Sequence, residues 1–266
     1  MFRRIASVSI FASLTLTGCI VPKGTKPEVD FGIDGASRFV HRGMTLVNRP
    51  VLQPHLDVAL DASTGGQLGF AANGNIDLYD NTGAAWFPDG HAGRFTQIEM
   101  VADYQHQFDW LTLRGGIHSY NLPNGQEFTN GERGGTNELF VLASANVLET
   151  TPYVSLHYDF DEVKDLYARA GLTEDFDIGS GFKLELDGSI GYAGGDQAAW
   201  MYGLEQSGWA DLRGSAMLNY DWDDRTTLQL GLHASTIVDS TLDTWFDDLG
   251  IDSDVYWVSL GVNWHF

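Results

Sequence analysis

The chain has 266 residues and a formal net charge of −21 at pH 7, from 36 acidic and 15 basic side chains. That charge repels a phosphate backbone, so nucleic acid is not expected as a partner, and the single cysteine excludes a disulfide framework. Hydrophobic residues make up 43% of the chain, which excludes a disordered polymer. The aromatic-rich, lysine-poor composition favours β structure.

The N-terminus predicts a targeting segment. Residues 1–18 have the features of a secretory signal peptide, because two arginines precede a short apolar segment over 5–16. Residues 16–19, Leu-Thr-Gly-Cys, resemble the lipoprotein box of bacteria, in which the cysteine is lipidated. The resemblance implies that Cys19 anchors the chain in outer-membrane lipid, with residues 19–28 as the lipidated N-terminus and tether. The alternative is an ordinary signal peptide followed by an unrelated cysteine.

From residue 29 to residue 266 the apolar side chains repeat with a period of two, which predicts β-strands in one domain. Beyond the N-terminus no run of about 18 apolar residues predicts a membrane-spanning helix. Twelve segments follow the pattern, an even number as in bacterial outer-membrane barrels. They cover 29–42, 52–61, 67–78, 97–104, 111–118, 138–146, 154–160, 166–173, 182–192, 211–220, 228–235 and 256–266.

The connections alternate in length. Short turns are predicted at 61–66, 106–109, 147–150, 175–181 and 222–224, and long loops at 43–50, 79–93, 121–135, 194–209 and 239–254. The connection over 161–165 is the exception, since it is short but lies on the rim that carries the long loops. Short turns on one rim and long loops on the other are typical of a transmembrane barrel, with the short turns and both termini in the periplasm.

A soluble β-sandwich has the same period, and two features favour the barrel. Aromatic residues of the apolar face lie near the segment ends, as in the interfacial girdles of a bilayer protein. The last eight residues, with Ser259, Gly261, Trp264 and Phe266, match the polar-x-Gly-x-x-aromatic-x-aromatic ending of bacterial outer-membrane barrels. That resemblance implies recognition by the barrel-assembly machinery. The predicted fold is an all-β, antiparallel up-and-down transmembrane barrel of about 12 strands.

The predicted inward face carries more acidic than basic side chains. A water-filled lumen with such a wall attracts cations, so small neutral or cationic solutes are the expected cargo. The alternative is a structural or surface-interaction barrel whose lumen is closed by ion pairs and aromatic side chains, since twelve strands lie between filled and open barrels. The candidate pore-lining residues are Asp30, Asp34, Arg38, Arg42, Asp57, Glu99, Arg114, Glu138, Arg169, Glu185, Asp187, Asp211 and Arg213.

One family resemblance lies near the start of the barrel. Residues 36–45, Ala-Ser-Arg-Phe-Val-His-Arg-Gly-Met-Thr, followed by Pro-Val-Leu-Gln over 50–53, resemble the start of the TorF-like porins of proteobacteria. In those proteins an aromatic-x-x-Arg-Gly motif precedes a short loop and a Pro-x-x-Gln strand. The resemblance covers the first two strands and their loop, and it implies an outer-membrane porin without naming a solute.

Other candidate chemistry is weaker. Ser155, His157 and Asp159 share one inward face, and such residue types leave an outer-membrane lipid hydrolase as a remote alternative. The six aspartates within 239–254 more often form a solvated loop than a Ca²⁺ site, and their spacing is not that of an EF-hand. The eight histidines show no metal-ligand spacing. We therefore predict no enzyme, no metal and no cofactor.

Overall fold

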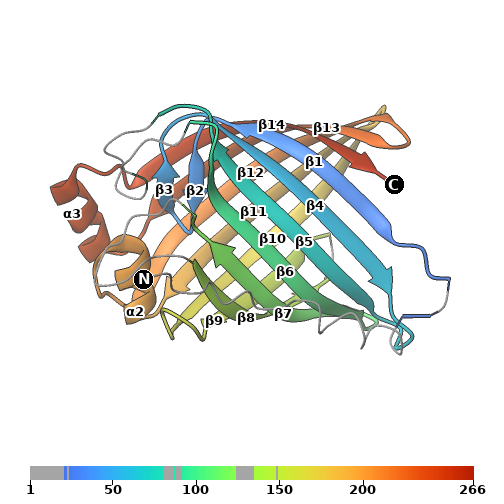
Figure 1. The fold of residues 1–266 in the computed structure, drawn as a ribbon, viewed down its shortest axis with the longest axis horizontal. Coiled ribbons are helices and arrows are strands. Elements are labelled where there is room, and N and C mark those ends of the chain that lie inside the picture. Colours follow the sequence, from blue (N-terminus) through green and yellow to red (C-terminus); the bar gives the residue numbers. More distant parts are fainter. Residues whose placement is uncertain (1–20, 23, 81–86, 88–91, 124–134, 148) are drawn as a thin grey trace, which may run out of the picture.

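The computed structural model describes residues 21–22, 24–80, 87, 92–123, 135–147 and 149–266. Twelve antiparallel strands form a closed barrel in the order β1-β14-β13-β12-β11-β10-β9-β8-β7-β6-β5-β4 (Figure 1). Two further strands, β2 and β3, pair only with each other. The prediction of a twelve-stranded antiparallel up-and-down barrel is therefore confirmed.

Most strands of the barrel are longer than the predicted segments, because pairing continues past the last residues that alternate clearly. Their bounds are β1 Glu28–Ala36, β4 Val51–Asp61, β5 Gln67–Asp77, β6 Phe95–Gln107, β7 Leu111–Asn121, β8 Gly135–Ala145, β9 Thr151–Asp159, β10 Leu166–Gly179, β11 Phe182–Ala193, β12 Gly208–Asp223, β13 Thr226–Ile237 and β14 Asp254–His265.

Closure joins the first and last strands. Phe31 of β1 is paired with Trp264 of β14, and their rings stack with centroids 5.6 Å apart. The backbone of Phe266 continues this pairing, since its N–H donates to Val29 O at 2.9 Å and its carbonyl accepts from Val29 N at 3.2 Å. No strand of the barrel is left with a free edge, which a lipid environment would penalise.

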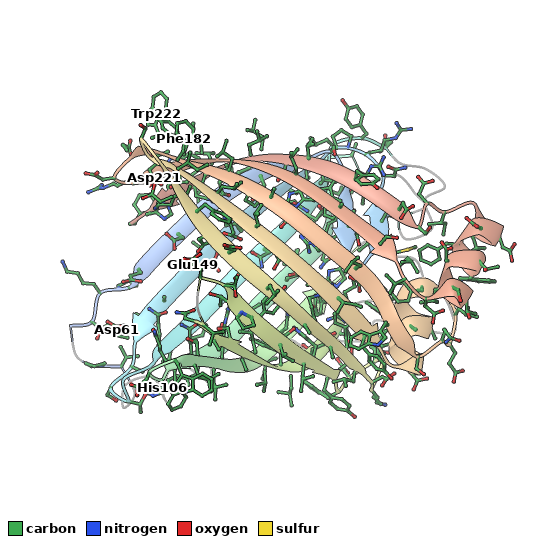
Figure 2. All side chains as sticks on the ribbon, turned by 180° about the vertical axis from the view of Figure 1, so that it is seen from behind. Asp61, His106, Glu149, Phe182, Asp221 and Trp222 are labelled. Atoms are coloured by element: carbon green, nitrogen blue, oxygen red, sulfur yellow. The ribbon has the colours of Figure 1, made fainter. Side chains whose placement is uncertain are left out.

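The outer surface has the pattern expected of a bilayer protein. Strand centres expose aliphatic side chains such as Val141, Leu230 and Leu260. Exposed aromatic residues lie at both ends of the barrel, including Tyr158 and Tyr256 at the long-loop end. Trp222 is exposed at the short-turn end (Figure 2). An apolar band between two aromatic girdles matches a membrane-spanning barrel. No helix in the described ranges is long and apolar enough to cross a membrane.

Long connections gather at one end, and they contain structure that the sequence pattern did not predict. Helices α2 (Gly195–Tyr202) and α3 (Ser240–Leu249) lie within segments predicted as loops, at the end opposite the C-terminus (Figure 1). Asp239 caps α3 by accepting from the backbone N–H groups of Thr241 and Leu242. Gly250 ends it at φ +67°, a left-handed conformation that glycine adopts without strain.

The first predicted strand is wrong in its second half. Strand β1 ends at Ala36, and the chain then forms the hairpin of β2 (Phe39–His41) and β3 (Met44–Val47), which folds inside the barrel (Figure 1). Arg38 and Arg42 therefore do not lie on a barrel strand as predicted. Arg38 lies in the link between β1 and β2, and Arg42 lies in the turn of the hairpin. The alternation failed here because Phe39 packs into an interior apolar cluster rather than facing lipid.

Candidate functional site

The β2–β3 hairpin, residues 39–47, spans the lumen toward the opposite wall. Its turn is formed by Arg42 at φ +47° and Gly43 at φ +80°. A Cβ atom on Gly43 would lie 2.6 Å from Cβ of Asp211 on β12, so only glycine allows this approach. The turn therefore contacts a strand that is several positions around the barrel from the strands that carry the hairpin.

Arg42 fixes the hairpin turn to the far wall. Its guanidinium donates to Glu138 Oε2 of β8 at 2.7 Å and to Tyr120 Oη of β7 at 3.3 Å. The two charged side chains are 6% and 2% exposed, so this is a buried ion pair. The Arg42 carbonyl accepts from Tyr202 Oη of α2 at 2.8 Å, and its guanidinium lies over the Tyr167 ring at 4.3 Å. We call the Arg42–Glu138 pair the latch.

The latch changes the ionisation of the hairpin. Burial alone would lower the pKa of Arg42, but Tyr120 and Glu138 outweigh it and raise that pKa above its usual value. Burial and the adjacent Arg42 charge lower the pKa of His41 from 6.5 to about 3, against the opposing effect of Glu99 and Glu138. The docked hairpin thus holds a permanent cation beside a neutral imidazole.

A second polar cluster lies on the wall beside the hairpin. Arg169 of β10 pairs with Asp211 at 2.8 Å, and Tyr167 donates to the same carboxylate at 2.6 Å. Arg213 lies over the Trp257 ring at 5.6 Å. Asp211 is fully buried, so the charges of Arg169 and Asp211 compensate each other instead of facing bulk water.

Apolar side chains fill the space between the hairpin and the helices. Phe39, Met44, Leu46 and Val47 are buried together with residues of α2, α3 and the strand ends. Phe246 of α3 is fully buried, and Trp245 donates from its indole to the Tyr202 carbonyl at 3.1 Å. The long-loop end of the lumen is therefore narrowed by a packed plug, consisting of the hairpin, α2 and α3.

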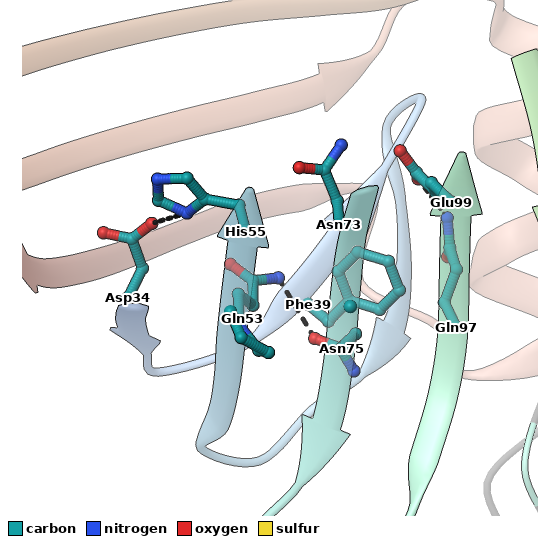
Figure 3. A pocket seen from close by; sticks show the side chains of 10 residues that line it. Asp34, Phe39, Gln53, His55, Asn73, Asn75, Gln97 and Glu99 are labelled. Atoms are coloured by element: carbon teal, nitrogen blue, oxygen red, sulfur yellow. Dashed lines mark hydrogen bonds and ion pairs between the residues drawn. The ribbon is translucent and has the colours of Figure 1, made fainter. Parts of the chain in front are cut away.

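A cavity of about 250 Å³ remains between the hairpin and the wall of β1, β4, β5 and β6 (Figure 3). Gln53 donates to Asn75 at 3.0 Å, and Asp34 lies 3.3 Å from His55. None of the described residues that line it is lysine or arginine. We call it the hairpin cavity, and its lining is Asp34, Phe39, Gln53, Pro54, His55, Asn73, Gly74, Asn75, Gln97 and Glu99.

A smaller cavity of about 170 Å³ lies nearer the short-turn end. Asp57 and Asp103 line it, and Arg114 reaches across to Asp103 at 2.7 Å. Both cavities are thus lined by carboxylates. In the smaller cavity, Arg114 neutralises the carboxylate of Asp103.

The strand alternation places most predicted pore-lining residues on the inner wall. The structure brings Glu138 to Arg42 and Arg169 to Asp211, pairs that sequence reasoning did not connect. The residues on the inner face of the strands are Asp30, Asp34, Asp57, Glu99, Arg114, Glu138, Arg169, Glu185, Asp187, Asp211 and Arg213. Sequence reasoning missed His41, Tyr120, Tyr167 and Tyr202, which surround the latch. The Arg-Gly pair of the Phe39-x-x-Arg-Gly motif was the signal that could have found them.

The Ser155-x-His157-x-Asp159 pattern does face inward, but its members serve other contacts. Asp159 accepts from Thr136 at 2.5 Å and from backbone N–H groups of the following turn. His157 lies 3.3 Å from Glu138 instead. Within the described residues no hydrogen bond joins Ser155, His157 and Asp159, so the geometry of a catalytic triad is absent there.

The terminal pattern is split between the two faces of β14. Ser259 lies inward and contacts His233 at 2.9 Å, and Gly261 faces the Asp34 carboxylate. Trp264 and Phe266 lie outward, and Phe266 is 72% exposed. Cys19 lies outside the described residues.

These features define a transmembrane barrel of the outer-membrane type, with an apolar outer band, a polar lumen and an inserted hairpin. No protein-family model and no curated protein matches the chain. Among solved structures it is similar to the COG4313 outer membrane channel from Pseudomonas putida F1, with 12% identity and a TM-score of 0.54 over 92% of this chain and 97% of that one. This similarity shows a shared fold.

Two more solved barrels are similar at lower TM-scores. The KdgM porin in complex with disordered oligogalacturonate has 11% identity and a TM-score of 0.47, covering 90% of this chain and 99% of that one. LpxR from Salmonella typhimurium has 12% identity and a TM-score of 0.49, covering 89% and 100%.

Proposed function

We propose that the protein is a narrow outer-membrane channel for small neutral or cationic polar solutes. One observation carries the proposal: the hairpin cavity is lined by amides and carboxylates, with no lysine or arginine among its described lining residues. Amide groups offer both donors and acceptors, so they can replace the water around a neutral polar solute. Asp34 and Glu99 add negative charge, which a low-dielectric wall focuses into the lumen.

The arrangement in the membrane is part of the same proposal. The short-turn end of the barrel and both chain termini face the periplasm, as in other outer-membrane barrels. A lipid on Cys19 would enter the inner leaflet on that side, and the tether ending at residue 28 is long enough to reach it. The barrel-assembly machinery would recognise the C-terminal pattern that ends in Phe266.

The resemblance to the TorF-like porins is consistent with this proposal. Its aromatic-x-x-Arg-Gly motif corresponds to Phe39, Arg42 and Gly43, which form the hairpin and the latch. Each residue of the Arg-Gly pair therefore has a structural role in this chain. Arg42 binds Glu138 on the opposite wall, and Gly43 permits the close approach to Asp211.

The test is electrical. The full chain would be inserted into planar bilayers, and single-channel conductance and reversal potential measured across a KCl gradient. We expect a small conductance with cation preference. Replacing residues 39–47 by a short Gly-Ser linker should increase the conductance, because the hairpin occupies the lumen. Anion preference of the intact protein, or no conductance from either protein, would contradict the proposal.

A closed-lumen barrel is the second candidate, and the packed plug is the observation that favours it. The plug combines a buried ion pair with an apolar cluster, and both resist rearrangement. This candidate predicts no conductance from the intact chain and a stable conductance once the hairpin is removed. The same pair of recordings therefore distinguishes the two.

A further inference from the structure

Three candidate metal ligands come from three neighbouring strands. His118 of β7 is paired directly with Glu138 of β8. His157 of β9 is paired with Phe140, two residues further along β8 on the same face. Direct and diagonal cross-strand neighbours can bring long side chains into contact. The spacing of these three residues in the sequence matches no metal-binding motif, because only the register of the strands brings them together.

The donor atoms of these side chains converge. One ligand atom from each of His118, Glu138 and His157 lies within 4.8 Å of the other two. His157 Nδ1 lies 3.3 Å from Glu138 Oε2, yet it is buried and has no hydrogen-bond partner among the described residues. A buried imidazole nitrogen without a partner is costly, unless something else contacts it.

Neighbouring groups hold both imidazoles in place. The His118 ring stacks on Tyr120 with centroids 4.0 Å apart, and its Nε2 lies 3.1 Å from Glu99 Oε2. The His157 ring stacks on Phe140 with centroids 5.7 Å apart. Carboxylates and aromatic walls around a histidine ligand are the outer contacts that orient such ligands in metal proteins.

We propose that His118, Glu138 and His157 bind a divalent transition-metal ion of the Zn²⁺ class inside the lumen. Two imidazoles and one carboxylate suit Zn²⁺, whereas Ca²⁺ and Mg²⁺ prefer oxygen donors alone. Three protein ligands leave a fourth position open to water or solute. The proposal does not depend on whether the lumen conducts.

Arg42 makes the site conditional on the hairpin. Its guanidinium already contacts Glu138 Oε2 at 2.7 Å, so a metal ion and Arg42 compete for the same carboxylate. Two cations beside one buried carboxylate repel each other strongly at short range. Metal binding should therefore weaken the latch, and loss of Arg42 should tighten metal binding.

The experiment measures Zn²⁺ binding to the full chain in detergent micelles after removal of metal with a chelator. Calorimetric titration should give one tight site per chain. His118→Ala and His157→Ala should each weaken it at least about tenfold. His233→Ala is the matched control, because His233 also faces the lumen and stacks on Trp257 with centroids 5.0 Å apart. Its Nδ1 is likewise buried, with no hydrogen-bond partner among the described residues. It should leave the affinity unchanged.

Two further measurements keep the result decisive. Arg42→Gln should bind Zn²⁺ more tightly than the unaltered chain. Co²⁺ added to the unaltered chain should give the visible absorption bands of a low-symmetry site with nitrogen donors. This measurement does not depend on the folding of any variant. Heat-modifiable migration in gels checks that each variant is a folded barrel. Equal weakening by His233→Ala, or the absence of both a tight site and the Co²⁺ bands, would overturn the proposal.

Discussion

The guanidinium of Arg42 lies 2.7 Å from a carboxylate oxygen of Glu138, although the two residues are 96 positions apart in the chain. The contact crosses the lumen, because Arg42 sits in the turn of the inserted hairpin and Glu138 on the inner wall of β8. Both side chains are buried, so each depends on the other for its compensation. The ion pair thus adds to the apolar packing and to the Tyr202 hydrogen bond that hold the hairpin in place.

Breaking the latch should loosen the plug. Removal of one partner of a buried ion pair costs about 3–5 kcal/mol, or a change of more than about a hundredfold in an equilibrium. We expect Arg42→Gln and Glu138→Gln each to raise single-channel conductance, and the double variant to add little to either. Arg49→Gln is the matched control, since Arg49 is an exposed arginine in the same connection. If the control raised conductance as much as Arg42→Gln, the latch would not be the cause.

Acid should weaken hairpin docking through His41. The pKa of His41 is lowered to about 3 when docked, so the docked state binds fewer protons than a released hairpin whose histidine has the ordinary pKa of 6.5. Docking is therefore fully stable above pH 6.5 and loses stability as the pH falls toward 3, by at most about 1.4 kcal/mol per unit. Conductance recorded with chelator present should rise over this range.

The groups that face His41 define the control. Arg42 and His118 oppose its protonation, whereas Glu99 and Glu138 favour it. His41→Gln removes the titrating group and leaves these charges in place, so the acid response should flatten. His106→Gln, at a short-turn end far from the hairpin, should retain it (Figure 2). An unchanged response in His41→Gln would assign the effect to another group.

Charge in the two cavities should set ion preference. Asp34→Asn should lower the cation preference, because it removes a carboxylate from the hairpin cavity. Arg114→Gln should raise it by leaving Asp103 unpaired. The cation preference should fade as the salt concentration is raised, because the screening length falls from about 10 Å at about 0.1 M to about 3 Å at about 1 M. Reversal potentials at several salt concentrations measure this, and equal shifts of the same sign from both variants would rule out the mechanism.

Phe266 should matter more for assembly than for the folded barrel. Its backbone pairs with Val29 whatever its side chain, and the residue is 72% exposed. Phe266→Ala should therefore reduce the amount of heat-modifiable barrel in the outer membrane and leave the stability of refolded protein nearly unchanged. Trp222→Ala, another exposed aromatic at the short-turn end, is the control. Normal membrane levels of Phe266→Ala would refute the assembly role.

Lipidation at Cys19 can be tested by labelling. Cells that express the unaltered chain should incorporate labelled fatty acid into it, and Cys19→Ala should abolish the label because the chain has one cysteine. A processed but unlabelled chain would instead indicate an ordinary signal peptide.

The sequence by itself determined the barrel. A period of two along segments such as 154–160 decides which side chains face lipid, since successive residues of a strand point to opposite faces. Turn lengths then distinguished the two rims, whereas aromatic positions and the C-terminal pattern favoured a barrel over a sandwich. These features are local or repeat along the chain, so they can be read without knowing which residues meet in space.

Only the tertiary structure decided what fills the lumen. Arg42 continued the alternation as a wall residue, but the burial of Phe39 and its neighbours turned the segment inward as a hairpin. His118, Glu138 and His157 showed no metal-ligand spacing, yet the register of β7, β8 and β9 brings them together. Alternation fixes the face of a side chain, whereas its neighbours depend on register and on the packing of distant loops, which no single segment encodes.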